Sequence, residues 1–215
     1  MDMLFPPRSD EESLRAISDD DFLSLIAPRL APCTRPGTVV LLPFQEPLVR
    51  SAIHEAKYHG SARAQALLAL ALAEYLREAE FDETRFDLEN SGLRSNLVSI
   101  VPIPLGAARR RERGFNQVEE VIRGALHDVQ GFALEPSLLV RTRETASQVS
   151  LPRREREENM RGAFRVAEDA AHPFDPARTY FVIDDVLTTG ATLQAAIDAL
   201  RAAGATQIIP LALAH

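Results

Sequence analysis

The sequence has a single cysteine, no long apolar run and no excess of positive charge. Cys33 alone cannot form a disulfide within the chain or build a cysteine-rich metal site, so we expect no zinc site. The longest apolar run, residues 66–73, is too short to cross a bilayer, and no signal-peptide pattern opens the chain. These features predict a cytoplasmic protein without membrane association. The net charge of −7 argues against nucleic-acid binding by the surface as a whole.

The 215 residues suffice for one well-buried α/β domain and a small attachment. Apolar segments typical of strands alternate with segments of helical periodicity, which predicts a central, mostly parallel sheet flanked by helices. We expect residues 1–46 to form an N-terminal appendage and residues 47–215 to form the main domain. The expected strands are 38–44, 97–102, 138–141 and 180–183, and the expected helices are 20–26, 47 to 54 or 57, 63–79, 115–128 and 194–203, with a loop at 57–60.

The most informative stretch is residues 180–193, with the sequence YFVIDDVLTTGATL. A β-branched apolar run typical of a central strand is followed by Asp184 and Asp185 and then by a turn into a helix. In open α/β sheets, ligands bind at the carboxyl ends of the strands, where a helix that begins there offers free backbone N–H groups to an anion. The segment therefore predicts a ligand site.

The turn after the two acids has the composition of a phosphate cradle. Glycine permits a positive φ or a close approach of the backbone, and threonine adds hydroxyl donors. Two carboxylates beside such a cradle would repel a phosphate unless they accept hydrogen bonds from neutral hydroxyls or share a cation. A sugar phosphate with a vicinal diol satisfies both halves of the site, whereas the alternative is a solvated turn with a threonine cap. The cradle residues are Thr188, Thr189, Gly190, Ala191 and Thr192.

Two other segments concentrate positive charge. Residues 109–113 hold four arginines and one glutamate, and residues 141–165 hold seven arginines and four glutamates. The first segment follows the expected strand 97–102, so its arginines emerge where a polyphosphate could bind through paired N–H donors. A solvated basic turn is the alternative for any single arginine. The second segment is long and polar, which is typical of a lid or of a solvated hairpin or helix.

The strand, the paired acids, the turn and the helix resemble the phosphoribosyl pyrophosphate (PRPP) signature of the type I phosphoribosyltransferases. Further motifs are similar to the ComF family, a branch of these enzymes associated with natural competence and DNA uptake. The resemblance covers about residues 47–215. The motifs are AKYHG at 56–60, GFNQ at 114–117, R-T-R-x-T-x-x-Q-x-x-L at 141–151, R-x-x-N at 156–159 and G-A-F at 162–164.

The chain departs from that family at its N-terminal end. Many members begin with Cys-x-x-Cys pairs that bind zinc, and here only Cys33 is present. Zinc binding is therefore not carried over from the resemblance, and neither are partner contacts made through such a finger. The PRPP half of the resemblance is unaffected.

The resemblance implies a type I phosphoribosyltransferase fold with PRPP as the ligand. Asp184 and Asp185 would be the catalytic pair that holds the ribose diol, with Mg²⁺ bridging the pyrophosphate and ribose oxygens. The cradle residues would bind the 5′-phosphate. The residues implied for the pyrophosphate are Leu105, Gly106, Ala107, Arg109, Arg110, Arg111 and Arg113.

Two further groups of residues take roles from the resemblance. A flexible loop would close over PRPP and keep water from the reactive sugar carbon. Its implied residues are Arg141, Thr145, Gln148 and Arg156. On the acceptor side the implied residues are Lys57, Tyr58 and His59.

Three functions stay open from the sequence. The first is a Mg²⁺-dependent phosphoribosyltransferase of nucleotide metabolism with an unidentified nitrogen acceptor, in which positioning and electrostatics supply most of the catalysis. The second is a non-catalytic PRPP- or nucleotide-binding module in DNA uptake, with single-stranded DNA or a competence helicase as its partner. The third is a family member that retains the fold alone, against which the intact acids and cradle argue. The resemblance is compatible with a homodimer.

Overall fold

The computed structural model describes residues 9–81, 98–143, 153–168 and 173–215. The helices are α1 (Ser9–Ala16), α2 (Asp19–Leu23), α3 (Pro47–His54), the π-helical turn η1 (Glu55–His59), α4 (Ala62–Phe81), α5 (Ala107–Arg113), α6 (Gln117–Ala125), α7 (Arg153–Met160) and α8 (Ala191–Ala202). The strands are β1 (Arg29–Ala31), β2 (Thr38–Leu42), β3 (Val98–Pro102), β4 (Phe132–Leu134), β5 (Leu139–Arg141), β6 (Phe164–Val166), β7 (Thr179–Val186) and β8 (Gln207–Ala214). None of these helices is long and apolar enough to cross a membrane.

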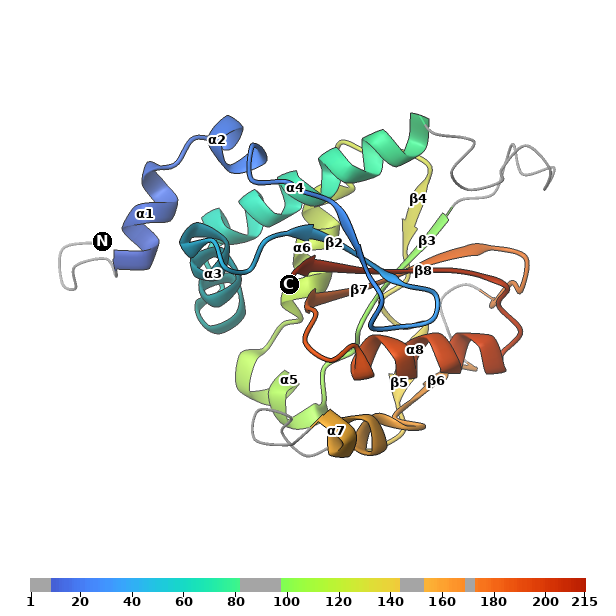
Figure 1. The fold of residues 1–215 in the computed structure, drawn as a ribbon. Helices are drawn as coiled ribbons and strands as arrows, with labels where there is room; N and C mark the ends of the chain where they lie inside the picture. The colour runs from blue at the N-terminus through green and yellow to red at the C-terminus, as the bar shows by residue number, and fades with distance from the viewer. Residues whose placement is uncertain (1–8, 82–97, 144–152, 169–172) are drawn as a thin grey trace.

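Six strands form one sheet in the order β1-β2-β8-β7-β3-β4 (Figure 1). Each neighbouring pair from β2 to β4 is parallel, and only β1 pairs antiparallel, with β2. A separate antiparallel pair, β5 and β6, lies outside this sheet. The predicted α/β class with a mostly parallel central sheet is confirmed.

The central strand β7 is apolar on both faces because helices cover both sides of the sheet. Phe181 and Ile183 pack into the core that includes α4 and α6, whereas Tyr180 and Val182 pack into the core that includes α8. This alternation follows from the two-residue period of a strand. It explains why the run 180–183 carries no charged residue.

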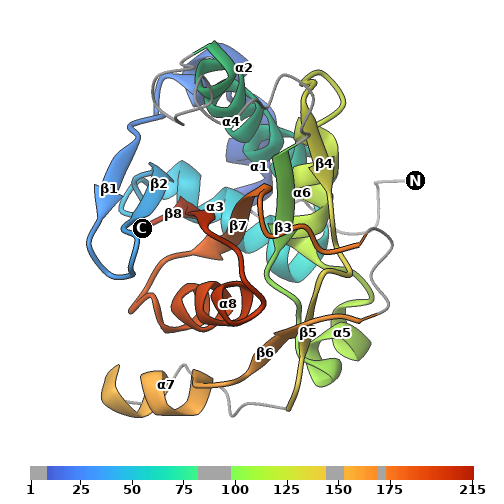
Figure 2. The ribbon, with the colours of Figure 1, turned by 90° about the vertical axis from the view of Figure 1, so that its right-hand side faces the viewer.

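Each face of the sheet has its own helical layer (Figures 1 and 2). Helices α3, α4 and α6 lie on one face, joined by buried side chains of α1 and α2 such as Leu14 and Phe22. Helix α8 covers the other face and lies between the sheet and α7 (Figure 2). The Ala and Leu repeat of α4 and the apolar stripe of α6 therefore both serve the first core, as their helical spacing predicts.

The N-terminal segment is part of the main sheet to a greater extent than its sequence predicts. Strand β2 pairs with β8 and β1 pairs with β2, so residues 29–42 belong to the main sheet rather than to an appendage ending at 46. The turn between β1 and β2 also reaches α8, where the backbone N–H of Arg35 donates to Gln194 Oε1 at 2.8 Å. The expectation failed because β1 has only three residues and no apolar period.

Three local details also differ from the sequence-based expectations. Residues 57–60 were expected as a loop, but 57–59 belong to η1 and Gly60 caps it, with its N–H donating to the carbonyl of Glu55. The arginines at 109–113, for which a solvated basic turn was one alternative, lie on the short helix α5. Strand β7 continues through both acids because Asp184 and Val186 pair with Ala212 and Ala214 of β8.

Candidate functional site

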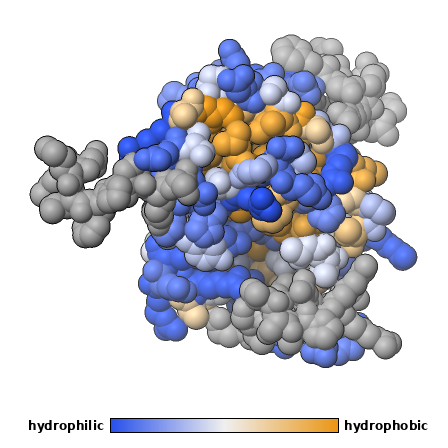
Figure 3. Space-filling model, turned by 60° about the vertical axis from the view of Figure 1, so that its left-hand side comes forward, coloured by the Kyte–Doolittle hydropathy of each residue, from blue (hydrophilic) through white to orange (hydrophobic). Residues whose placement is uncertain are grey.

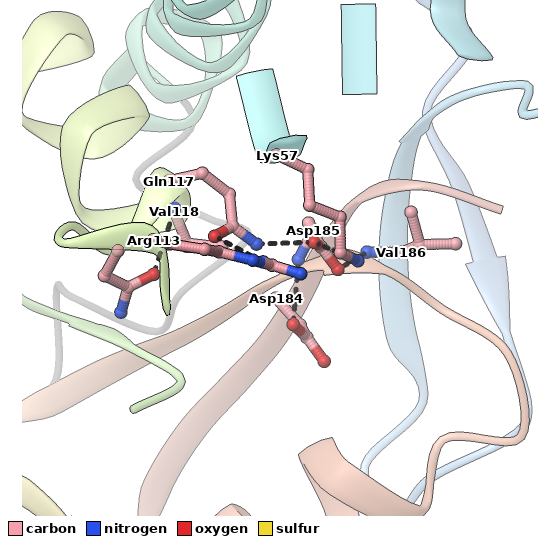
Figure 4. A network of polar contacts seen from close by, with 8 residues as sticks. Lys57, Arg113, Gln117, Val118, Asp184, Asp185 and Val186 are labelled. Carbon is pink, nitrogen blue, oxygen red and sulfur yellow. Dashed lines mark hydrogen bonds and ion pairs between the residues drawn. The ribbon is translucent and has the colours of Figure 1, made fainter. Parts of the chain in front are cut away.

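Strands β3 and β7 run parallel side by side, so their carboxyl ends open onto the same edge of the sheet. Asp184 and Asp185 directly precede Val186, the last residue of β7, and their side chains leave the strand in different directions (Figure 4) because neighbouring residues of a strand face opposite sides. The side chain of Asp184 lies on the same face of the strand as that of Val182, which is the face covered by α8. The side chain of Asp185 lies on the same face of the strand as that of Ile183, which is the face covered by α6. The two acids therefore approach a shared ligand from two sides of the strand end.

Both carboxylate oxygens of Asp185 are engaged by the protein (Figure 4). Its Oδ2 lies 2.7 Å from Nζ of Lys57 and accepts a 2.7 Å hydrogen bond from Nε2 of Gln117. Its Oδ1 accepts the backbone N–H of Val186 at 2.8 Å. Arg113 in turn donates to Oε1 of Gln117 at 3.2 Å. This network ties η1, α5 and α6 to the end of β7.

Asp184 is half-buried, and its Oδ1 accepts the backbone N–H of Asp185 at 2.9 Å. Desolvation, followed by the negative charge of Asp185, raises the pKa of Asp184 from 3.8 to about 7. The hydrogen bond from Asp185 and the charges of Lys57 and Arg141 act in the opposite direction. Near neutral pH this carboxyl therefore exists in both protonation states, and a bound cation or hydroxyl donor would favour the ionised state.

The cradle predicted at residues 188–192 forms the turn between β7 and α8. Gly190 has a φ of 80° and is the residue before α8. A Cβ at this position would lie 2.9 Å from the backbone oxygen of Cys33, so glycine is required by conformation and by space together. Cys33 lies in the turn between β1 and β2, so it is this turn that Gly190 approaches closely. Thr188 is exposed, whereas Thr189 and Thr192 are partly exposed beside the buried Ala191.

The residues expected to bind pyrophosphate lie on and just before α5. Gly106 is buried and precedes the helix, and Ala107 is exposed at its start. Arg109, Arg110 and Arg111 are exposed. The last residue of this set, Arg113, turns toward η1, where its guanidinium carbon lies 5.1 Å from the ring centroid of Tyr58.

A cavity of about 590 Å³ opens between the start of α5 and strand β5. Its lining brings Leu105 and Arg110 together with Arg141, although they lie far apart in the sequence. Arg141 is fixed by a 3.0 Å hydrogen bond from its Nε to the carbonyl of Pro104, and its guanidinium carbon lies 5.0 Å from the ring centroid of Phe164. The cavity therefore contains positive charge that is held in place before a ligand binds. It lies next to the side of β7 that carries Asp184.

Figure 3 brings the left-hand side of Figure 1, with the carboxyl edge of the sheet, toward the viewer. Hydrophilic residues surround a hollow in this face, and hydrophobic residues gather above it.

The other predicted site residues have mixed outcomes. Thr145 and Gln148 lie outside the described residues, and Arg156 lies in α7. The three residues expected on the acceptor side point to different neighbours: Lys57 to Asp185, Tyr58 to Arg113, and His59 to Glu55. The structure therefore shows Lys57 in contact with the acid pair, whereas the resemblance implied a role for it on the acceptor side.

The motif GFNQ at 114–117 contains functional residues that the site prediction missed. Gly114 has a φ of 77° and ends α5. Asn116 caps α6 by accepting the N–H of Val118 at 3.1 Å and donates to the carbonyl of Ile103 at 3.0 Å. These bonds fix α6 on the end of β3 and hold Gln117 over Asp185. Lys57 also carries a sequence signal, because it is the single lysine among 24 basic residues.

No protein-family model matches the chain. Among curated proteins, the DNA utilization protein YhgH of Salmonella typhi is 32% identical over 109 residues, which are 51% of this chain and 45% of that protein. Competence protein F of Haemophilus influenzae is 31% identical over 110 residues, covering 51% of this chain and 47% of that protein.

The chain is a distant homologue of these competence and DNA-utilization proteins. The predicted ComF resemblance is thereby confirmed at the level of distant homology, over half of this chain. The aligned part spans about half the length of the curated relatives. Among solved structures, a hypoxanthine phosphoribosyltransferase from Staphylococcus aureus aligns with 61% of this chain and 59% of that chain, at 13% identity and a TM-score of 0.32.

Proposed function

We propose that the protein binds PRPP with Mg²⁺ at the carboxyl edge of the sheet and transfers the phosphoribosyl group to a nitrogen nucleophile. The observation that carries this proposal is the short connection from the acid pair, through the Gly190 turn, to the start of α8. A ribose 5-phosphate has a diol and a phosphate on one small ring, and this connection offers carboxylates to the diol and backbone N–H groups to the phosphate.

The donor set at the acid pair fits Mg²⁺. This ion prefers oxygen ligands and is usually held by one or two carboxylates together with substrate oxygens. Asp184 is the better candidate ligand, because Asp185 already accepts hydrogen bonds or ion pairs at both oxygens. When bound, Mg²⁺ would neutralise charge on the leaving pyrophosphate.

The transfer would break the bond between C1 of the ribose and the pyrophosphate oxygen and form a bond from C1 to the acceptor nitrogen, which loses a proton. Arg110 and Arg141 would hold the departing pyrophosphate in the cavity between α5 and β5. Lys57 and Gln117 would keep Asp185 in one orientation, so that its negative charge lies at a fixed place near the developing positive charge on the sugar.

The test is isothermal titration of the protein with PRPP in the presence of Mg²⁺. Wild type should bind in the micromolar range, and Asp184→Asn should weaken binding by at least about tenfold, because one charge-assisted contact contributes roughly 1.5–3 kcal/mol. Asp198→Asn is the matched control, since Asp198 is exposed on α8 and accepts a hydrogen bond from Gln194 at 2.8 Å.

Catalysis is tested separately from binding. Pyrophosphate release should depend on an added acceptor when bases and amines are screened with PRPP and Mg²⁺. Binding without acceptor-dependent release across a broad panel would reduce the proposal to a PRPP-binding module.

A second candidate function is a module in DNA uptake that binds single-stranded DNA or a competence helicase. The relatives' names favour it, together with the exposed arginines 109–111 on α5. It predicts salt-sensitive binding to single-stranded DNA that is lost when Arg109, Arg110 and Arg111 are all changed to Ala. Binding that is unchanged in this variant would exclude α5 as the DNA contact.

A further inference from the structure

The last residue of α3 and the two ends of the π-helical turn η1 bring together three metal-ligating side chains outside the acid-pair site: His54, Glu55 and His59. One ligand atom from each residue lies within 4.8 Å of the other two. Nδ1 of His54 and Nε2 of His59 are both 3.9 Å from the same atom, Oε1 of Glu55. We propose that these three residues bind a zinc ion through two imidazoles and one carboxylate.

The spacing of the trio depends on the π-helical geometry. His54 and His59 are five residues apart, and i→i+5 hydrogen bonding brings residues with this separation onto one face of the helix. Their ring centroids lie 5.4 Å apart in an edge-on arrangement. An α-helix would place residues five apart on different faces, so the widened turn is what brings the second imidazole to Glu55.

The distances favour a bridging ion over direct contact. A nitrogen and an oxygen at 3.9 Å are too far apart for a hydrogen bond. Two donors bound to one tetrahedral zinc ion lie about 3.4 Å apart, since each bond is about 2.0–2.2 Å long and neighbouring bonds meet at about 109°. Both histidine–glutamate distances, 3.9 Å, are therefore only about 0.5 Å longer than in a tetrahedral zinc site, so a small inward shift of the two exposed imidazoles would let one ion bind all three residues.

Burial and ligand chemistry indicate which ion would bind. The Glu55 side chain is only 1% exposed, and a buried carboxylate is stabilised by a cation held against it. Imidazole nitrogens suit zinc and similar transition metals, whereas Mg²⁺ prefers an all-oxygen site. Two histidines and one glutamate leave a fourth tetrahedral position for water. This site contains no cysteine, so it is unrelated to a Cys-x-x-Cys finger.

A zinc ion bound to these three residues would affect how η1 is placed at the acid pair. Lys57 projects from the same turn to Asp185, between the two histidines in sequence. An ion held by residues at both ends of η1 would brace the turn and thereby keep Lys57 on Asp185. The proposal does not depend on PRPP binding, because none of the three ligands belongs to the acid pair or to the cradle.

Zinc titration of the metal-stripped, untagged protein tests the site. Wild type should bind one equivalent, and Co²⁺ substitution should give the visible absorption of a tetrahedral site, which zinc then abolishes. The double variant His54→Ala/His59→Ala should lose this spectrum and weaken zinc binding by at least about tenfold, since even a lost outer partner of a metal ligand has such an effect. Both side chains are partly exposed, 51% and 30%, so their truncation should leave the fold intact.

Two control variants make the result decisive. His127→Ala removes an 86% exposed histidine that faces Asp128 alone, and it should leave zinc binding unchanged. Cys33→Ser removes the single thiol and should also have no effect. No zinc binding by wild type, equal binding by the double histidine variant, or loss of binding in Cys33→Ser would each overturn the proposal. If wild type bound PRPP but did not bind zinc, the zinc proposal would be wrong and the proposed function would still stand.

Discussion

The ammonium of Lys57 lies 2.7 Å from Oδ2 of Asp185, which makes the single lysine of the chain a direct partner of the acid pair. Gln117 binds the same oxygen from α6 at 2.7 Å. Two helical segments that are far apart in the sequence therefore converge on one carboxylate. The result is an asymmetric pair, in which Asp185 is held by the protein and Asp184 keeps a raised pKa and a side chain on the opposite face.

Replacing Lys57 with Met should raise the pKa of Asp184 further above about 7, because the lysine charge is one of the influences that lower it. The shift can be followed by NMR titration of ¹³C-labelled aspartate carboxyls. Arg123→Met is the control, since its ion pair with Glu119 is exposed on α6. An unchanged Asp184 titration in Lys57→Met would show that the ammonium does not act on this carboxyl.

Asp185→Asn should speed the acylation of Lys57 by amine reagents severalfold. In the native protein the Lys57 side chain is 22% exposed and its ammonium is ion-paired, and both features slow its reaction. Because Lys57 is the only lysine, the modified side chain can be followed by peptide mass spectrometry without interference from another lysine. Asp198→Asn should leave the rate unchanged. Equal rates in the Asp185 variant and the native protein would argue that the ion pair is absent in solution.

The raised pKa of Asp184 predicts a pH dependence of stability with a definite sign. Its folded pKa of about 7 lies above the ordinary 3.8, so the folded state holds the proton more tightly. The contribution of this group to the free energy of unfolding is therefore full at low pH and decreases as the pH rises from about 4 to about 7.

Asp184→Asn should remove this pH-dependent contribution. At pH 8 the variant should be more stable than the native protein by about 2 kcal/mol, roughly half of what the full shift would give, because Asp184 is partly exposed. Urea unfolding at pH 4, 6 and 8 measures the difference, with Asp198→Asn as the control. A difference that does not grow with pH would contradict the raised pKa.

The sequence predicted the parts of the site that are local in the chain. The apolar run 180–183, the acids and the Gly190 turn appear together because a buried strand, its end and the next helix are contiguous. The helices α4 and α6 followed from their periodicity and α8 followed from its helix-forming residues, with ends displaced by a few residues.

The missed features depend on contacts between distant segments. Nothing near Lys57 in the sequence indicates that η1 faces β7, and the contact between Gly190 and Cys33 joins residues from opposite ends of the chain. Strands β1, β4 and β6 have three residues each, too few to show a period. Their places come from pairing with neighbours rather than from their own composition.

Gly190→Ala should cost more stability than the same change at Gly114, although the two glycines have nearly equal φ angles of 80° and 77°. At Gly114 no atom lies within 4 Å of the new Cβ, so the cost is the backbone conformation alone, about 1–2 kcal/mol. At Gly190 the new Cβ would also lie 2.9 Å from the backbone oxygen of Cys33, which cannot move aside by a side-chain rotation. We expect a total loss of about 3–4 kcal/mol there. Urea unfolding of both variants measures this difference, and equal losses would mean that the β1–β2 turn does not pack against the start of α8.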